Sequence, residues 1–355
     1  MTAQAKLEDA VTGLLKSQGA DRSTSIGHLA RAIHPARSNF KFMLGLAAYF
    51  DESGHSEDPA CRFVGIGGIC APSATWEEFE GKWQAILDEG CGGVPFHMNK
   101  FAAQEEPFKG WDESRRKEFL GSLVKVVKET DAQVFGAVVS LDAYAIVCRG
   151  IPQAEKFLGE PYHLCFQDVT RAAALSVIGY GLEPSLRSVE DWLEFENNER
   201  VAMVYARQKE YGTISSPAGT LPKNMGRAES LWYAIKDANP HFGKWMGSYA
   251  SAIPEELNFL QAADLFAYEL THEFENRVHR PNDPMRWALA ELLPGSWRDF
   301  LHKFYGVPQL LELMSESGFL GPRDPRHGLS IQTSMDDIMH RDLLFSRMYQ
   351  RRCRK

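Results

Sequence analysis

The sequence predicts an α/β fold in which helices flank a mixed sheet. Short apolar runs typical of strands recur along the chain, and they alternate with segments whose apolar residues recur at helical spacing. The 355 residues are enough to bury one large core or two modest ones. No apolar run approaches the roughly 18 residues that cross a bilayer, so a membrane protein is not expected.

Three parts are expected along the chain: a helical N-terminal extension, a core α/β domain with a helical insertion, and a helical C-terminal extension. They cover residues 1–42, 43–280 with the insertion at about 73–130, and 281–355. The expected strands of the core cover 43–51, 63–69, 133–141, 191–196 and 245–252, which makes a sheet of five strands. The helices expected after the insertion cover 162–178, 198–211, 228–237 and 258–275.

Local signals justify the first elements. The first strand is an apolar run that stops at Asp51 and Glu52, after which Ser53 and Gly54 favour a turn. The second strand contains the run VGIGGI. No helix start with Lys followed by Ser or Thr comes after these glycines, so close backbone packing within the sheet is expected and a phosphate loop is not.

The insertion begins with a helix from Ser73 to about Glu89, for which Ser73 or Thr75 is a suitable N-cap. A second helix is expected to begin near Asp112. Between the two lies the glycine-rich loop that contains His97. The run QVFGAVVSL then predicts a buried strand.

Composition narrows the class of protein. The polar start MTAQAKLEDA lacks the charged-then-apolar order of a secretory signal, which predicts a cytoplasmic location. The six cysteines include no Cys-x-x-Cys pair, so neither a zinc knuckle nor a disulfide framework is indicated. A net charge of −8 argues against coating of nucleic acid by bulk attraction. A local basic track remains open at Arg200, Arg207, Lys209, Lys223 and Arg227.

Acids stand where ordinary folding favours none. Asp51 ends an apolar strand, and Asp264 lies in the middle of a helix although Asp is a poor helix former. In the strand over 191–196, Glu194 and Glu196 share one face and point away from the apolar face. The apolar stripe beside Asp264 consists of Leu260, Ala263, Ala267, Leu270 and Phe274.

The segments AAYFDESG and NFLQAADLFAYE, with an acid-bearing strand between them, resemble the domain-of-unknown-function family 3800. That family is assigned to the ribonuclease H-like superfamily of retroviral integrases and DDE transposases. The resemblance covers about residues 46–275 and implies a ribonuclease H-like mixed five-stranded sheet flanked by helices. It also implies that Asp51 is the first-strand acid, Glu196 the middle-strand acid and Asp264 the last-helix acid.

The middle acid has alternatives in Glu194 and Glu199, because all three lie close together in the sequence. Glu196 is preferred since it lies at a strand end, as Asp51 does. The resemblance implies supporting roles for Glu52, Gln261 and His97, and His97 would orient water, transfer a proton or contact the scissile phosphate.

Clustered carboxylates suit divalent-metal chemistry. Hydrolysis of a phosphodiester by in-line attack needs charge neutralised on both the attacking and the leaving oxygen, and two metal ions achieve this. Mg²⁺ and Mn²⁺ prefer oxygen ligands. The expected function is therefore a Mg²⁺- or Mn²⁺-dependent nuclease acting on RNA or DNA, with a two-ion site held by Asp51, Glu196 and Asp264.

Each of these residues also has a structural explanation. Residues 51–54 form a common turn sequence, and Asp264 is able to join a buried hydrogen-bonded network with Gln261, Tyr268 and Thr271. Two other functions fit the sequence: a catalytically silent ribonuclease H-like scaffold that binds nucleic acid or a protein partner, as in bacterial defence systems, and an enzyme for a small phosphorylated or nucleotide substrate. The sequence leaves open whether the chain forms a homo-oligomer.

Overall fold

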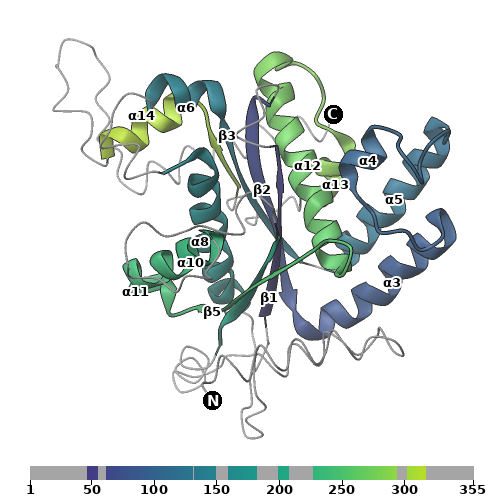
Figure 1. Ribbon diagram of the computed structural model, residues 1–355, viewed down its shortest axis with the longest axis horizontal. Helices are drawn as coiled ribbons and strands as arrows, with labels where there is room; N and C mark the ends of the chain where they lie inside the picture. Colours follow the sequence, from purple (N-terminus) through teal and green to yellow (C-terminus); the bar gives the residue numbers. More distant parts are fainter. Residues whose placement is uncertain are drawn as a thin grey trace, which may run out of the picture. The chain divides into compact units, whose positions relative to one another are not determined.

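The computed structural model in Figure 1 describes residues 46–54, 61–130, 132–148, 159–181, 199–207, 227–293 and 302–316. The predicted N-terminal extension lies outside these residues. So does the predicted strand over 191–196, with Glu194 and Glu196. No helix of the described part is long and apolar enough to cross a membrane.

The described residues contain a mixed six-stranded sheet flanked by helices, which confirms the α/β class. The strands run in the order β5-β4-β1-β2-β3-β6. Three pairs are parallel: β1 with β4, β4 with β5, and β3 with β6. The strands are β1 (Leu46–Ser53), β2 (Phe63–Pro72), β3 (Gln133–Ser140), β4 (Val201–Ala206), β5 (Met246–Ala252) and β6 (His302–Tyr305).

Helices occupy the stretches between the strands. They are α3 (Ser73–Cys91), α4 (Met98–Ala102), α5 (Glu113–Glu129), α6 (Leu141–Val147), α8 (Pro161–Gly181), α10 (Arg227–Ala238), α11 (Pro240–Gly243), α12 (Asn258–His279), α13 (Trp287–Leu292) and α14 (Val307–Glu316). The predicted start of α5 is confirmed, because Asp112 is its N-cap and accepts a hydrogen bond from Arg115 N at 2.8 Å. The predicted cap of α3 is wrong: Pro72 occupies the N-cap position and makes no side-chain cap.

The prediction of a helix over 198–211 is wrong for its described residues, because β4 occupies Val201–Ala206. Its sequence VAMVYA contains two β-branched residues and a tyrosine, which fit a pleated surface better than an exposed helix. The strand pairs in parallel with β1, from Val201 opposite Leu46 to Tyr205 opposite Phe50. All but the last residue of β4 are buried, and neighbouring strands favour the extended form over local helix propensity.

The C-terminal segment also differs from the prediction of an entirely helical extension. Besides α13 and α14 it contributes β6, which pairs in parallel with β3 and makes the sheet six-stranded. The sequence HKFY is too short for a strand signal of its own, so its pairing with β3 decides its conformation.

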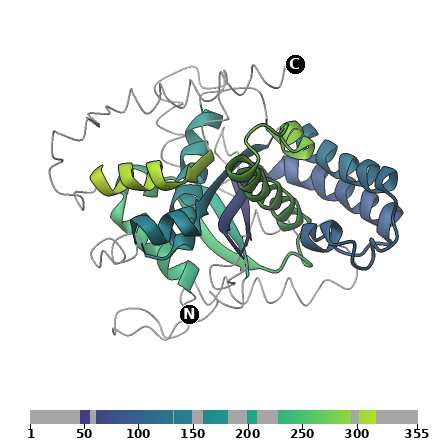
Figure 2. The same cartoon turned by 90° about the horizontal axis from the view of Figure 1, so that it is seen from above.

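The chain divides into two compact units. The first comprises residues 1–51, 68–133 and 170–265. In it, α3 and α5 run side by side, as Figures 1 and 2 show. Aromatic rings of α3 and α12 form much of its core, and Trp76 and Phe259 both pack on Tyr49 of β1, at 5.1 and 4.8 Å between ring centroids. These contacts place the beginning of α12 on the Tyr49 face of β1.

The second unit comprises residues 52–67, 134–169 and 266–355. Here α12 lies so close to β2 that a Cβ on Gly67 would come within 2.7 Å of the Ala267 backbone. The predicted reason for the VGIGGI glycines, close packing within the sheet, is therefore refined: at Gly67 the close neighbour is a helix. The unit also contains an ion pair, in which the half-buried Arg286 binds the buried Glu269 through two hydrogen bonds of 2.7 and 2.8 Å.

Candidate active site

The first half of α12 carries two buried polar side chains one turn apart, Gln261 and Asp264. Their spacing of three residues puts both on one side of the helix, where they face the segment that contains His97. Asp264 is only 6 % exposed, and Leu260, Ala263 and Ala267 beside it are fully buried. The predicted position of Asp264, next to the apolar stripe of a helix, is confirmed.

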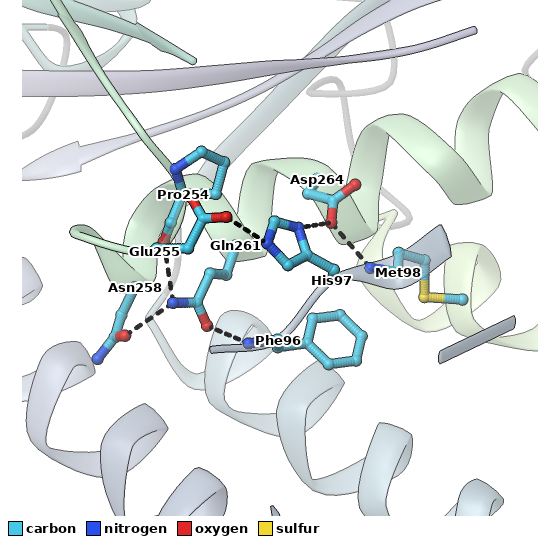
Figure 3. Close-up of polar contacts among 8 residues, drawn as sticks. All are labelled: Phe96, His97, Met98, Pro254, Glu255, Asn258, Gln261 and Asp264. Carbon is cyan, nitrogen blue, oxygen red and sulfur yellow. Dashed lines mark hydrogen bonds and ion pairs between the residues drawn. The ribbon is translucent and has the colours of Figure 1, made fainter. Parts of the chain in front are cut away.

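Both the oxygen and the nitrogen of the Gln261 side-chain amide make hydrogen bonds. Its oxygen accepts hydrogen bonds from Trp83 Nε1 at 3.1 Å and from Phe96 N at 2.9 Å. Its nitrogen donates to Pro254 O at 3.0 Å and to Asn258 Oδ1 at 3.2 Å. The side chain thus joins α12 to α3, to the segment before His97 and to the segment between β5 and α12 (Figure 3).

His97 lies between two carboxylates (Figure 3). Its Nε2 is 3.1 Å from Glu255 Oε1, and its Nδ1 is 3.8 Å from Asp264 Oδ2. The imidazole is 22 % exposed, whereas the Glu255 side chain is 51 % exposed. A buried acid, a histidine and a more exposed acid therefore follow one another toward solvent.

Asp264 also binds the backbone of the His97 segment. Its Oδ2 accepts a hydrogen bond of 2.8 Å from Met98 N, the first residue of α4. His97 is the N-cap of α4 and makes no side-chain cap, so Asp264 supplies an acceptor for an otherwise unsatisfied helix N–H. Within the described residues, the other carboxylate oxygen of Asp264 makes no hydrogen bond.

Burial raises the pKa of Asp264 from its ordinary value of 3.8 to about 6, although the Met98 N–H and His97 act in the opposite direction. Desolvation disfavours the charged form of a carboxylate, which explains the sign. Glu255 behaves differently. Burial opposes a decrease there, but a hydrogen bond to its own backbone and the neighbouring His97 and Lys100 hold its pKa below the ordinary value. The surroundings of His97 thus shift the pKa values of its two neighbouring acids in opposite directions.

Asp51 lies at the carboxyl end of β1, half-buried. Since side chains alternate along a strand, it shares a face with Tyr49, which packs on Phe259 of α12. Asp51 and Asp264 therefore both belong to the α12 side of β1. The same alternation directs Glu52, which the sequence offers as a supporting residue of the site, to the opposite face of β1.

The structure bears on one of the three alternatives for the middle acid. Glu199 is buried and precedes β4, whose Val201 pairs with Leu46 at the beginning of β1. In the parallel pairing of β1 with β4, Asp51 lies opposite the last residue of β4, which is seven residues after Glu199. At about 3.3 Å per residue, Glu199 and Asp51 are therefore about 23 Å apart along the strand direction. Glu199 is thus excluded as a partner of Asp51, and the preferred Glu196 lies outside the described residues, as Glu194 does.

No group of three or more His, Cys, Asp and Glu side chains in the described part is arranged to hold a metal ion. The two carboxylates nearest His97 approach opposite ring nitrogens, so they do not converge on one point. A divalent ion at this place would need Asp264 together with Asp51, the undescribed Glu196, water or substrate oxygens.

Sequence reasoning missed Glu255. It is one of two adjacent acids, Glu255 and Glu256, in a turn before α12, and no pattern distinguishes the one that contacts His97. Four aromatic residues on or near α10 and β5 differ in their exposure. Trp232 and Trp245 are buried core residues, Tyr249 is half-buried, and Tyr233 is 39 % exposed.

Fold and site together define an α/β protein with a carboxylate–histidine cluster, in which Asp264 of α12 and Glu255 of the preceding turn lie on either side of His97. Comparison of the chain with protein-family models, with curated proteins and with solved structures gave no match. Function is therefore inferred from the residues of the cluster and from the resemblance carried by the segments around Asp51 and Asp264.

Proposed function

We propose that this chain is a divalent-metal-dependent nuclease of the ribonuclease H-like class, related to the domain-of-unknown-function family 3800. The observation that carries the proposal is Asp264, a carboxylate buried on α12 next to His97. The order of elements also supports it. Asp51 lies near the carboxyl end of the first strand, and Asp264 lies on the helix that follows β5.

Burying a carboxylate in an apolar helix costs stability, which favours a functional reason for keeping Asp264. A structural residue of the same size, such as asparagine, would also accept the hydrogen bond from Met98 N without the cost of a buried charge. A carboxylate is needed, in contrast, to hold a hard cation.

The described residues fit Mg²⁺ or Mn²⁺ only with help from other ligands. Asp264 has one oxygen without a hydrogen bond to a described residue, and Asp51 lies on the same side of β1. Mg²⁺ is commonly held by one or two carboxylates plus water and substrate phosphates, so a site completed by the substrate and by Glu196 is consistent with this set. The ions would neutralise charge on the attacking and leaving oxygens.

His97 is the acid–base candidate of the proposed site. It is partly exposed, and its ring is oriented by Asp264 on one side and Glu255 on the other. Such a histidine is able to accept a proton from an attacking water or donate one to a leaving oxygen. Asp51, Asp264 and Glu196 are proposed as the metal ligands, and a nucleic acid as the substrate.

A catalytically silent scaffold that binds nucleic acid is the second candidate. The observation that favours it is the hydrogen bond between Asp264 and Met98 N, because it gives this carboxylate a structural use. In this function the cluster fixes the loop before α4, and no bond is cleaved.

The test uses labelled RNA and DNA oligonucleotides with the purified full-length protein. Cleavage should require Mg²⁺ or Mn²⁺, and Asp264→Asn or Asp51→Asn should each abolish it while circular dichroism and thermal unfolding report an intact fold. Mn²⁺ should raise the melting temperature of the wild type and leave that of Asp264→Asn unchanged, because a ligand of the native state stabilises it.

The matched control is Asp237→Asn, which removes the same charge from an exposed position on α10. Cleavage that survives both site substitutions would exclude the proposed site. Binding of oligonucleotides without metal-dependent cleavage would favour the scaffold.

A further inference from the structure

Gln261 lies between the segment that contains His97 and the segment that contains Glu255. It holds Phe96, the residue before His97, through its oxygen, and Pro254, the residue before Glu255, through its nitrogen. His97 and Glu255 then contact each other at 3.1 Å across the gap that Gln261 spans (Figure 3).

We propose that Gln261 is a positioning residue that sets the His97–Glu255 pair, and that Glu255 is a functional member of the site. This inference rests on the proposed function for its catalytic meaning, but its geometric content is independent of any activity. Gln261 acts through His97 and Glu255, and it does not itself contact a reacting group.

The choice of an amide follows from the four hydrogen bonds. Trp83 Nε1 and Phe96 N both need an acceptor, while Pro254 O and Asn258 Oδ1 both need a donor. Only a side chain with a carbonyl oxygen and an NH₂ group satisfies both sides at once, and glutamine has the length to do so from α12. Because Gln261 is 1 % exposed, water does not replace a lost partner easily.

The amide also allows the two sides to be separated experimentally. Gln261→Glu keeps an acceptor for Trp83 and Phe96 but turns the donor toward Pro254 O into a second acceptor. The segment that bears Glu255 should then move away from His97, while the bond between Asp264 and Met98 N remains. Gln261→Met removes both the acceptor and the donor of the amide and keeps the size of the side chain.

The decisive measurement is the nitrogen NMR spectrum of histidine-labelled full-length protein, in which the His97 signals are identified by their loss in His97→Asn. Glu255→Gln should shift the Nε2 resonance. Gln261→Glu should shift it as well, and adding Glu255→Gln to Gln261→Glu should cause no further shift, because the contact is already lost. Glu256→Gln, which removes the same charge from the exposed neighbouring position, should leave the resonance in place.

An unchanged Nε2 resonance in Gln261→Glu, or additive shifts in the double variant, would overturn the positioning role. Should Gln261→Glu fail to fold, Asn258→Ala provides the same test in milder form, because it removes one acceptor of the Gln261 amide from a half-buried position. A shift in the same direction is then expected, and no shift would count against the proposal.

Kinetics give the functional readout where the wild type cleaves nucleic acid. Gln261→Glu and Glu255→Gln should each lower kcat by roughly 10–100-fold with KM little changed, since misplacing a group by about 1 Å costs about that much. Equal activity of both variants and wild type would remove Glu255 from the site. Absence of cleavage by the wild type refutes the nuclease proposal alone, because the NMR comparison still decides whether Gln261 positions the pair.

Discussion

Asp264 illustrates how a buried acid changes the stability of its own fold. Its pKa is raised to about 6 by burial, so the native state binds a proton more tightly than the unfolded chain does. Above pH 6 the ionised carboxylate weakens the native state. This penalty disappears as the pH falls through the interval between about 6 and the ordinary value of 3.8.

Asp264→Asn should therefore be more stable than the wild type at pH 7, by up to about 3 kcal/mol for a pKa shift of this size. The difference should shrink toward zero by about pH 4, where the wild-type carboxyl is protonated. Urea unfolding of both proteins at several pH values measures it. A stability difference that is constant with pH, or that resembles that of Asp237→Asn, would contradict a raised pKa at Asp264.

His97 and Glu255 show why site residues are hard to predict when each is considered separately in the sequence. His97 stood out in the sequence as a histidine in a glycine-rich loop, but Glu255 had no distinguishing neighbour. Only the fold brings the segment after β5 to the segment before α4, and it does so through Gln261. Glu255 belongs to the site only because the fold brings these two segments into contact.

At the scale of elements, β4 had the largest consequence for the predicted site. Its apolar residues fit helical spacing as well as a short strand, and the ambiguity is resolved by pairing with β1 and β5. With the strand at Val201–Ala206, Glu199 falls at the beginning of a parallel strand and thus at the edge of the sheet opposite to Asp51.

The packing of α12 on β2 predicts a strong effect of a small substitution. Gly67→Ala would place a methyl group 2.7 Å from the Ala267 backbone. This clash is relieved only if β2 or α12 moves. A loss of about 1–3 kcal/mol in the free energy of unfolding is expected for such overpacking. Chemical denaturation monitored by circular dichroism provides the measurement.

Gly81→Ala is the matched control, because a Cβ at this exposed position of α3 meets no atom within 4 Å. Alanine is the better helix former, so this change should stabilise the protein by about 0.5–1 kcal/mol. Similar effects of the two substitutions would show that α12 does not pack on β2 as closely as described.

At the scale of the whole molecule, the C-terminal segment belongs to the fold. Its strand β6 extends the sheet next to β3, and α14 packs on α6 and β6. In α14, Leu310 and Met314 are fully buried while Leu311 is 39 % exposed. A dispensable appendage would not bury such residues.

Substitution of two neighbouring leucines of α14 tests whether this helix packs on the rest of the fold. Leu310→Ala should lower the free energy of unfolding by about 2–5 kcal/mol, as expected for a cavity in a packed core. Leu311→Ala should change it by less than about 1 kcal/mol, because the side chain is already partly in water. Thermal or urea unfolding of the two variants gives the answer, and equal small effects would contradict the packing of α14 on the rest of the fold.

The sequence alone determined the α/β class, the first three strands, the two long helices of the insertion, α3 and α5, and the buried position of Asp264. These features depend on local periodicity and caps, which are written in consecutive residues. The tertiary structure decided the strand character of β4 and β6, the opposite positions of Glu199 and Asp51, and the contact of His97 with Glu255. These depend on pairing between distant segments, where hydrogen bonds and burial outweigh local preference.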